Sequence, residues 1–217
     1  MGRWDTYLVT QESLSTGRST LGIVRAAVDG GVDAVQLREK DRSARARYHL
    51  GCKLRAVTRR ADVTFVVNDR VDLARAVDAD GVHLGSEDVP VETARDLLGE
   101  EAIVGRSASF VEEARRAERA GADYLGVGAV YATGSKDDVP DDEHAVGPGR
   151  VAAIADAVDV PIVGIGGITP DNAGPVIEAG ADGVAVITAI TGADDPRAAT
   201  ESLGRAVDAA KSERSTR

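Results

Sequence analysis

Eight short apolar runs, rich in β-branched residues, recur along the chain, and polar residues rarely interrupt them. Such runs are typical of the strands of a parallel sheet that helices cover on the outside. Most of the stretches between the runs read as helices, with apolar positions at helical spacing at 112–120 and 151–158. We therefore predict an α/β fold, a single (β/α)8 barrel. The runs lie at Tyr7–Val9, Ala34–Val35, Phe65–Val67, Gly81–Leu84, Ile103–Val104, Tyr124–Val127, Ile162–Ile165 and Gly183–Ile187.

A short motif ending in aspartate introduces the second, fourth, sixth and eighth runs. A glycine in three of these motifs supplies the left-handed turn that ends a helix. The aspartates should lie at the amino ends of the strands, away from any active site, so we assign them to architecture. The four are Asp33, Asp80, Asp123 and Asp182.

The pattern predicts one catalytic barrel domain over residues 1–210 and a polar, frayed C-terminal tail over 211–217. The long interval between Val127 and Ile162 is rich in Gly, Pro and Asp. Long loops in compact domains tend to be lids or binding loops, and we expect this one to be such a loop. No linker or second domain is predicted.

The composition narrows the class of protein. With 217 residues and 43% hydrophobic content the chain can bury the core of one domain. No apolar run has the length of a membrane span, and MGRWDTYLVT lacks a signal-peptide pattern, so we expect a cytoplasmic protein without a membrane partner. The single cysteine, Cys52, excludes an internal disulfide and a multi-cysteine metal site. A homo-oligomer remains open.

The net charge of −10 argues against nucleic acid as a partner, because phosphate backbones attract basic surfaces. Ordinary solubility explains an acidic surface, and so does a high-salt cytoplasm, in which acidic groups keep the chain hydrated. We favour the second explanation as a hypothesis. Lysine occurs only at positions 40, 53, 136 and 211, so lysines at candidate site positions are informative.

Polar residues crowd the ends of successive apolar runs. The segment QLREK at 36–40 places one amide, two cations and one carboxylate directly behind Ala34–Val35. A polyphosphate needs several charge-assisted hydrogen bonds from more than one direction, and this density of donors suits it. NDR at 68–70, HLGSED at 83–88 and TGSK at 133–136 follow later runs in the same way. In a barrel these ends meet at one face, where active sites lie.

Two carboxylates, Asp69 and Asp88, follow the third and fourth runs and would come from adjacent loops. Mg²⁺ is usually held by one or two carboxylates, with water and substrate phosphate completing its coordination. An alternative remains open, in which both residues only cap turns or helices.

The segment GIGGITP at 164–170 ends the seventh run and lacks the spacing of a dinucleotide fingerprint. Thr169 followed by Pro170 predicts a helix start, and amides at Gly166 and Gly167 could bind an anion there. Barrel enzymes often hold a phosphate after strands seven and eight, and Ile187–Thr188 end the eighth run. A tight turn that merely needs glycine is the alternative. The three histidines, His49, His83 and His144, have no metal-binding spacing, and we favour structural roles for them.

Seven motifs in order resemble the thiamine-phosphate synthase family across nearly the whole chain. They are QLREK, NDR, GVHLGSED, GRS, ATGSKDD, GIGGIT and VITAI. The resemblance implies a (β/α)8 TIM barrel enzyme that joins hydroxymethylpyrimidine diphosphate to hydroxyethylthiazole phosphate and releases pyrophosphate. It also implies Mg²⁺ as cofactor and a dissociative mechanism that needs no protein nucleophile.

The resemblance assigns roles residue by residue. Mg²⁺ would bind Asp69 and Asp88, and Arg38, Lys40, Ser107 and Lys136 would be catalytic. The pyrimidine diphosphate would bind Gln36, Arg38, Lys40, Asn68, Ser107 and Lys136, with Leu37 and Glu39 of the same QLREK segment also in the substrate site. The thiazole phosphate would bind Thr133, Gly134, Ser135, Gly167, Ile187 and Thr188.

The chain departs from the family pattern at three positions. Ser86 stands where the family usually has Gln, and Thr188 stands where Ser is frequent. Ala132-Thr133-Gly134-Ser135-Lys136 stands where Pro-Thr-x-Thr-Lys is common, so the proline is missing. Two rivals remain. The thiazole tautomerase branch carries His where this chain has Ala129 and lacks the two aspartates, and a non-catalytic phosphate-binding barrel would have no reason to retain them.

Overall fold

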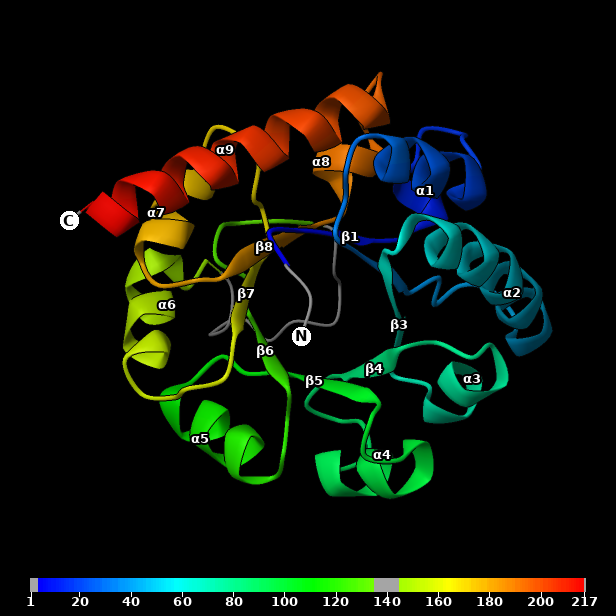
Figure 1. Ribbon diagram of the computed structural model, residues 1–217, viewed down its shortest axis with the longest axis horizontal. Coiled ribbons are helices and arrows are strands. Elements are labelled where there is room, and N and C mark those ends of the chain that lie inside the picture. The colour runs from blue at the N-terminus through cyan, green and yellow to red at the C-terminus, as the bar shows by residue number, and fades with distance from the viewer. Residues whose placement is uncertain (1–3, 135–144, 217) are drawn as a thin grey trace.

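In the computed structural model, which describes residues 4–134 and 145–216, eight parallel strands close into a barrel (Figure 1). The first strand pairs with both the second and the eighth, and every strand pairs with its sequence neighbours. Each predicted apolar run forms a strand, so the barrel prediction is confirmed. The strands are β1 (Thr6–Val9), β2 (Ala34–Leu37), β3 (Thr64–Asn68), β4 (Gly81–Leu84), β5 (Ile103–Ser107), β6 (Tyr124–Val127), β7 (Ile162–Ile165) and β8 (Gly183–Val186).

Helices surround the barrel, and the long last helix runs along the top of Figure 1 beside α7 and α8. Serine side chains cap two of them, since Ser19 and Ser43 accept hydrogen bonds from backbone N–H groups three residues later. The helices are η1 (Glu12–Leu14), α1 (Thr20–Asp29), α2 (Ala44–Ala61), α3 (Val71–Ala76), α4 (Val91–Leu98), α5 (Val111–Arg119), α6 (Gly147–Ala155), α7 (Ala173–Glu178), α8 (Thr188–Thr191) and α9 (Pro196–Thr216).

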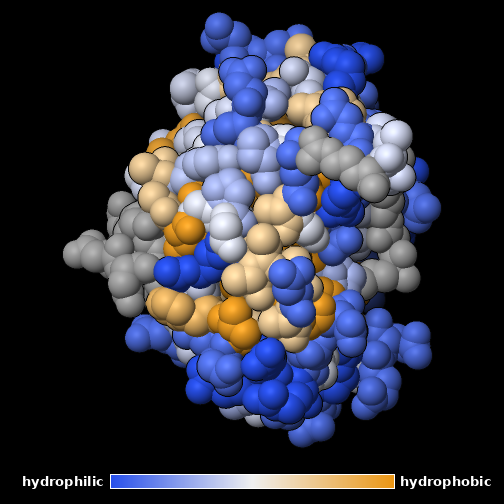
Figure 2. Space-filling view, turned by 90° about the vertical axis from the view of Figure 1, so that its left-hand side faces the viewer, coloured by the Kyte–Doolittle hydropathy of each residue, from blue (hydrophilic) through white to orange (hydrophobic). Residues whose placement is uncertain are grey.

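The charged residues of the surrounding helices, as in α2 and α5, lie at exposed or half-buried positions. Figure 2 shows one side of the molecule, where hydrophilic residues dominate the upper and lower parts and hydrophobic residues gather between them. Amphipathic helices around a barrel bury an apolar stripe and leave the polar face in water. Most of the acidic groups can therefore stay in water, and the few buried charges, such as Asp5 and Glu39, have polar partners.

Two apolar layers hold the barrel together. One lies between the strands and the helices, and the other fills the barrel interior around Trp4, Tyr7 and Tyr124. Alternation along each strand sorts the side chains, so Leu37 belongs to the outer layer and Ala34 to the inner one. The Trp4 ring packs on Tyr124 with 4.4 Å between centroids.

The four aspartates each accept a hydrogen bond from a backbone N–H of the preceding strand. The acceptor carboxylates of Asp33, Asp80, Asp123 and Asp182 lie 2.7–2.9 Å from the nitrogens of Thr6, Phe65, Val104 and Ile162 respectively. Their own N–H groups donate to the carbonyls of the same four residues. Each aspartate therefore joins an odd strand to the following even strand at the amino end, as the sequence predicted.

The C-terminal end differs from the expected frayed tail. α9 continues to Thr216, and Arg214 donates to the carbonyl oxygens of Ile177 and Ala181 at 2.8 and 3.0 Å. The ammonium of Lys211 lies 2.5 Å from the buried Asp5 carboxylate. These contacts tie residues 211–216 to the barrel. Within the described residues, no helix is both long and apolar enough to cross a membrane.

Candidate active site

A cavity of about 630 Å³ opens at the carboxyl ends of the strands. Its volume lies in the range of small-molecule sites, and this face carries the active site in barrel enzymes. The structure brings ten of the predicted site residues to its wall. They are Arg38, Lys40, Asn68, Asp69, Asp88, Ser107, Thr133, Gly167, Ile187 and Thr188.

The QLREK segment divides its side chains among three environments. Arg38 and Lys40 line the cavity. The Gln36 amide points into the barrel interior, where its Nε2 donates to the hydroxyl of Tyr7 at 2.8 Å. Leu37 is buried in the layer between strands and helices. Strand alternation dictates both placements, and neither side chain is on the cavity wall, so their role in binding substrate stays a prediction.

Glu39, which the sequence also placed in the substrate site, is not on the cavity wall. Its carboxylate is buried and accepts from the hydroxyl of Thr20 at 2.6 Å and from the N–H of Glu12 at 3.0 Å. These donors satisfy the buried charge, and they fasten the loop after β1 to the loop after β2. The same β1 loop supplies Gln11, whose Oε1 accepts from the Arg38 guanidinium at 2.5 Å. Glu39 therefore has a structural role beside the arginine.

Lys40, Asp69 and Asp88 form one charged group in the cavity. The Lys40 ammonium lies 3.2 Å from Asp69 Oδ2. Asp69 has the left-handed φ of 63°, which aspartate tolerates better than most residues, and its N–H donates to the carbonyl of His83 at 2.8 Å. Asp88 hydrogen-bonds Asp69 and also accepts from the N–H of Gly85 at 2.6 Å. The two predicted metal ligands thus touch each other.

Burial raises the pKa of Asp88 to about 6, and the hydrogen bond with Asp69 acts in the same direction. The nearby Lys40 and the Gly85 N–H act against these two causes. Two carboxylates in contact favour a shared proton or a cation between them.

The donor set fits Mg²⁺, because that ion prefers hard oxygen ligands and is often held by only two carboxylates. Asp69 and Asp88 supply such oxygens from adjacent loops, in a cavity with room for water and phosphate. Across the described residues, no group of three or more His, Cys, Asp or Glu could hold a metal. The pair is therefore suited to an ion whose other ligands come from substrate and water.

The opposite wall is built from backbone. Gly166 and Gly167 line the cavity with φ of 102° and 63°. A Cβ on Gly167 would lie 2.7 Å from the carbonyl oxygen of Ala132. Glycine is required here because both the left-handed backbone and the close approach exclude a side chain.

The predicted helix start at Thr169 is displaced. The Thr169 N–H donates to Asn172 Oδ1 at 2.8 Å, which makes a turn, and α7 begins at Ala173. The side-chain Nδ2 of Asn172 also donates to the carbonyl oxygen of Gly167 at 3.0 Å. Asparagine side chains commonly close such turns. The glycine wall is therefore braced by a turn, and not by a helix that begins at Pro170.

His83 lines the cavity, although the sequence favoured a structural role for it. Its Nε2 lies 3.0 Å from the hydroxyl of Ser107, and its Nδ1 lies 2.9 Å from that of Tyr124. The available signal was strand alternation, which places the residue two positions after Gly81 on the same inner face. Sequence reasoning also missed Ser109, whose hydroxyl donates to the carbonyl of Gly128 at 3.2 Å beside the cavity.

The loop after β6 reaches the cavity through Ala129, Ala132 and Thr133. Gly134 is exposed and is not part of the cavity wall. Ser135 and Lys136, predicted to bind substrate, and His144 lie outside the described residues.

A family model for thiamine monophosphate synthase matches residues 6–190, which span the whole barrel. The chain belongs to this family. Thiamine-phosphate synthase of Haloarcula marismortui is 69% identical over 94% of this chain and 97% of its own. The protein of the same name from Haloquadratum walsbyi is 62% identical over 96% of this chain and 93% of its own.

A solved structure described as thiamine phosphate pyrophosphorylase from Pyrococcus furiosus superposes with a TM-score of 0.87. It is 42% identical, and the match covers 96% of this chain and 97% of that one. The resemblance stated from the motifs is confirmed, and so is the prediction of an enzyme, a transferase of the thiamine-phosphate synthase family.

Proposed function

We propose that the protein condenses hydroxymethylpyrimidine diphosphate with hydroxyethylthiazole phosphate to give thiamine phosphate and pyrophosphate. The observation that carries the proposal is the cluster of Lys40, Asp69 and Asp88 in the same cavity as the glycine wall at Gly166 and Gly167. One part of the cavity suits a metal-bound diphosphate, and the other suits a second phosphate held by backbone amides.

The proposed chemistry balances without a protein nucleophile. The bond between the pyrimidine methylene carbon and the diphosphate oxygen breaks, and its electron pair leaves with pyrophosphate. The thiazole nitrogen then gives its lone pair to the methylene carbon and forms the new C–N bond. No proton has to be removed from the reacting atoms, so electrostatic stabilisation and positioning supply the rate.

The charged wall has the task of stabilising the leaving group. Arg38 is held by Gln11 with its guanidinium at the cavity, where it can hydrogen-bond diphosphate oxygens. Lys40 adds a second positive charge. Asp69 and Asp88 would hold Mg²⁺, which would supply further neutralisation of the diphosphate charge when bound. Asn68 and Ser107 can donate to the same substrate, and Lys136 keeps the role that the family resemblance assigns to it.

The second substrate fits the glycine wall. Backbone amides at Gly166 and Gly167, together with the exposed hydroxyl of Thr188, offer donors to a phosphate. Ile187 is buried beside them and gives an apolar surface for the thiazole ring. Thr133 approaches from the loop after β6. This assignment brings the thiazole nitrogen and the pyrimidine methylene into one cavity.

Residue 129 separates the proposal from the tautomerase alternative. Ala129 lines the cavity, and its methyl group cannot transfer a proton, whereas the tautomerase branch carries a histidine at this place. The paired aspartates point the same way, since a tautomerase has no diphosphate to neutralise. Both observations support the synthase.

The test is a two-substrate assay with Mg²⁺, in which thiamine phosphate and pyrophosphate are measured separately. We expect the two products in equal amounts and neither product when one substrate is omitted. Calorimetry is run on the same protein. Binding of both substrates without turnover would instead support the non-catalytic phosphate-binding barrel.

A further inference from the structure

Four hydrogen bonds join five polar side chains in a continuous network from the barrel interior to the cavity. Gln36 Nε2 donates to the Tyr7 hydroxyl at 2.8 Å, and that hydroxyl lies 3.1 Å from the Tyr124 hydroxyl. The Tyr124 hydroxyl lies 2.9 Å from His83 Nδ1, and His83 Nε2 lies 3.0 Å from the Ser107 hydroxyl. His83 and Ser107 line the cavity, whereas the proposed reaction gives no task to the two tyrosines.

The Gln36 amide fixes the donor and acceptor roles along the whole series of hydrogen bonds. An amide NH₂ group donates and does not accept, so the Tyr7 oxygen accepts and its proton is left for Tyr124. The Tyr124 oxygen then accepts, and its proton goes to His83 Nδ1. Burial raises the pKa of both phenols, so each keeps its single proton. A ring nitrogen that accepts has no proton, which leaves the His83 proton on Nε2.

The barrel keeps space for this chain. A Cβ on Gly105 would lie 2.2 Å from the Tyr124 ring, and a Cβ on Gly126 would lie 2.9 Å from His83 Cε1. The strand register sets these glycines against the two rings, because Gly105 pairs with both His83 and Tyr124. The His83 and Tyr124 rings thereby pack together in the barrel interior, tilted by 34° with 5.4 Å between centroids, and the network depends on the glycines as much as on the polar groups.

We propose that Gln36, Tyr7 and Tyr124 are positioning residues that hold His83 in its Nε2–H tautomer. The Ser107 hydroxyl then accepts from His83 and directs its own proton into the cavity. A serine hydroxyl can donate or accept, but because this one accepts from His83, its own proton is left to donate toward the cavity. On the proposed function, the Ser107 hydroxyl then donates to an acceptor atom of the pyrimidine diphosphate and disfavours a donor at that position.

The tautomer can be measured without substrate by ¹⁵N NMR of histidine-labelled protein. The chain has three histidines, so His49→Gln and His144→Gln variants assign the His83 signals by elimination. We expect the Nδ1 resonance of an unprotonated nitrogen and the Nε2 resonance of a protonated one. The opposite pattern overturns the proposal. The His83 tautomer is measured without turnover, so the NMR result can contradict this proposal while the proposed function still holds, and the reverse.

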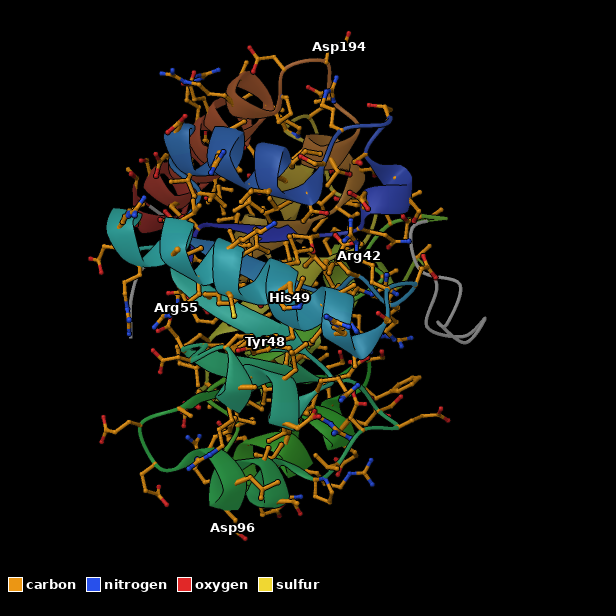
Figure 3. All side chains as sticks on the ribbon, turned by 90° about the vertical axis from the view of Figure 1, so that its right-hand side faces the viewer. Arg42, Tyr48, His49, Arg55, Asp96 and Asp194 are labelled. Carbon is orange, nitrogen blue, oxygen red and sulfur yellow. The ribbon has the colours of Figure 1, made fainter. Side chains whose placement is uncertain are left out.

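The matched variant is Tyr124→Phe, which removes only the hydroxyl that donates to Nδ1. We expect the second tautomer to appear and kcat/KM to fall about threefold to tenfold, the usual effect of one neutral hydrogen bond. In a Ser107→Ala background the same change should cost less than about twofold, because Tyr124 acts through Ser107. Tyr48→Phe, on the exposed face of α2 (Figure 3), is the control and should leave both readouts unchanged.

An unchanged tautomer and an unchanged kcat/KM in Tyr124→Phe contradict the inference. If this variant does not fold, the tautomer of the unmodified protein still decides, as does Gln36→Met, which removes the first donor and should mix the two tautomers.

Discussion

The ammonium of Lys40 lies 3.2 Å from Asp69, the carboxylate that also touches Asp88. One cation thus faces a pair of carboxylates, and burial together with the contact to Asp69 raises the pKa of Asp88. Asp69 and Asp88 would hold a divalent ion here, and Lys40 would place a second positive charge beside it. Lys40, Asp69 and Asp88 come from the motifs QLREK, NDR and GSED respectively, so these contacts bring three separate motifs together in one charged cluster.

Removal of either carboxylate should disable the reaction. We expect Asp69→Ala and Asp88→Ala each to lower kcat by about 100-fold to 1,000-fold, the usual effect of deleting one electrostatic contribution to the transition state. Steady-state kinetics at saturating Mg²⁺ measures this. Asp96→Ala, on the outer face of α4 (Figure 3), is the control and should behave as the unmodified protein. Near-normal kcat in both site variants would remove the aspartates from the mechanism.

The Lys40 charge should matter beyond its salt bridge. We expect Lys40→Met to lower kcat by about tenfold to 100-fold, because the leaving diphosphate loses one compensating charge. The side chain is 41% exposed, so folding stability should change little. Lys53→Met, exposed on α2, is the control. Loss of stability with kcat retained would make the lysine structural.

Gly167→Ala should damage the thiazole phosphate site. The substitution puts a Cβ at a φ of 63° and 2.7 Å from the Ala132 carbonyl, so the wall must shift. We expect the KM for the thiazole phosphate to rise about tenfold, with a smaller change for the pyrimidine diphosphate. Gly174→Ala in α7, where an added Cβ meets nothing within 4 Å, is the control. Equal KM values in the two variants would contradict the assignment.

The aspartates at the amino ends of the strands should affect the stability of the fold and not its activity. Asp80 accepts from the N–H of Phe65 and from two nitrogens of Arg55. We expect Asp80→Ala to lower the free energy of unfolding by about 2–3 kcal/mol, because a buried N–H and a partly buried guanidinium lose their acceptor. Denaturant titration measures it. Arg59→Ala breaks an exposed pair with Asp78 and should cost less than about 0.5 kcal/mol. Equal losses would refute the distinction.

The net charge of −10 leads to a prediction about salt. Self-repulsion of an acidic surface weakens as ions screen it, and a protein adapted to high salt should gain stability from it. We expect the melting temperature to rise steadily between dilute buffer and molar KCl. A flat or falling series would leave ordinary solubility as the explanation of the composition.

The sequence predicted the barrel because strand alternation and the Asp motifs are local signals, and Asp33 through Asp182 behave as expected. Glu39 was harder, since its partners Thr20 and Glu12 lie far back in the chain and only folding brings them to it. The end of α9 depends likewise on carbonyls of Ile177 and Ala181.

His83 shows a different limit. Alternation alone could have turned it inward, but its role depends on Tyr124 and Ser107, which β5 and β6 bring against it. Hydrogen-bond partners on two other strands leave no periodic signal in the sequence. The sequence could therefore predict which strand ends form the candidate site, but not the hydrogen bonds that join His83 to Tyr124 and Ser107.

The most direct test of the account is the two-substrate assay titrated with Mg²⁺ after chelation. We predict that thiamine phosphate formation is absent in excess chelator and returns with added Mg²⁺ in the unmodified protein, but not in Asp69→Ala or Asp88→Ala. Full activity in excess chelator would contradict the metal assignment and, with it, the role given to the paired aspartates.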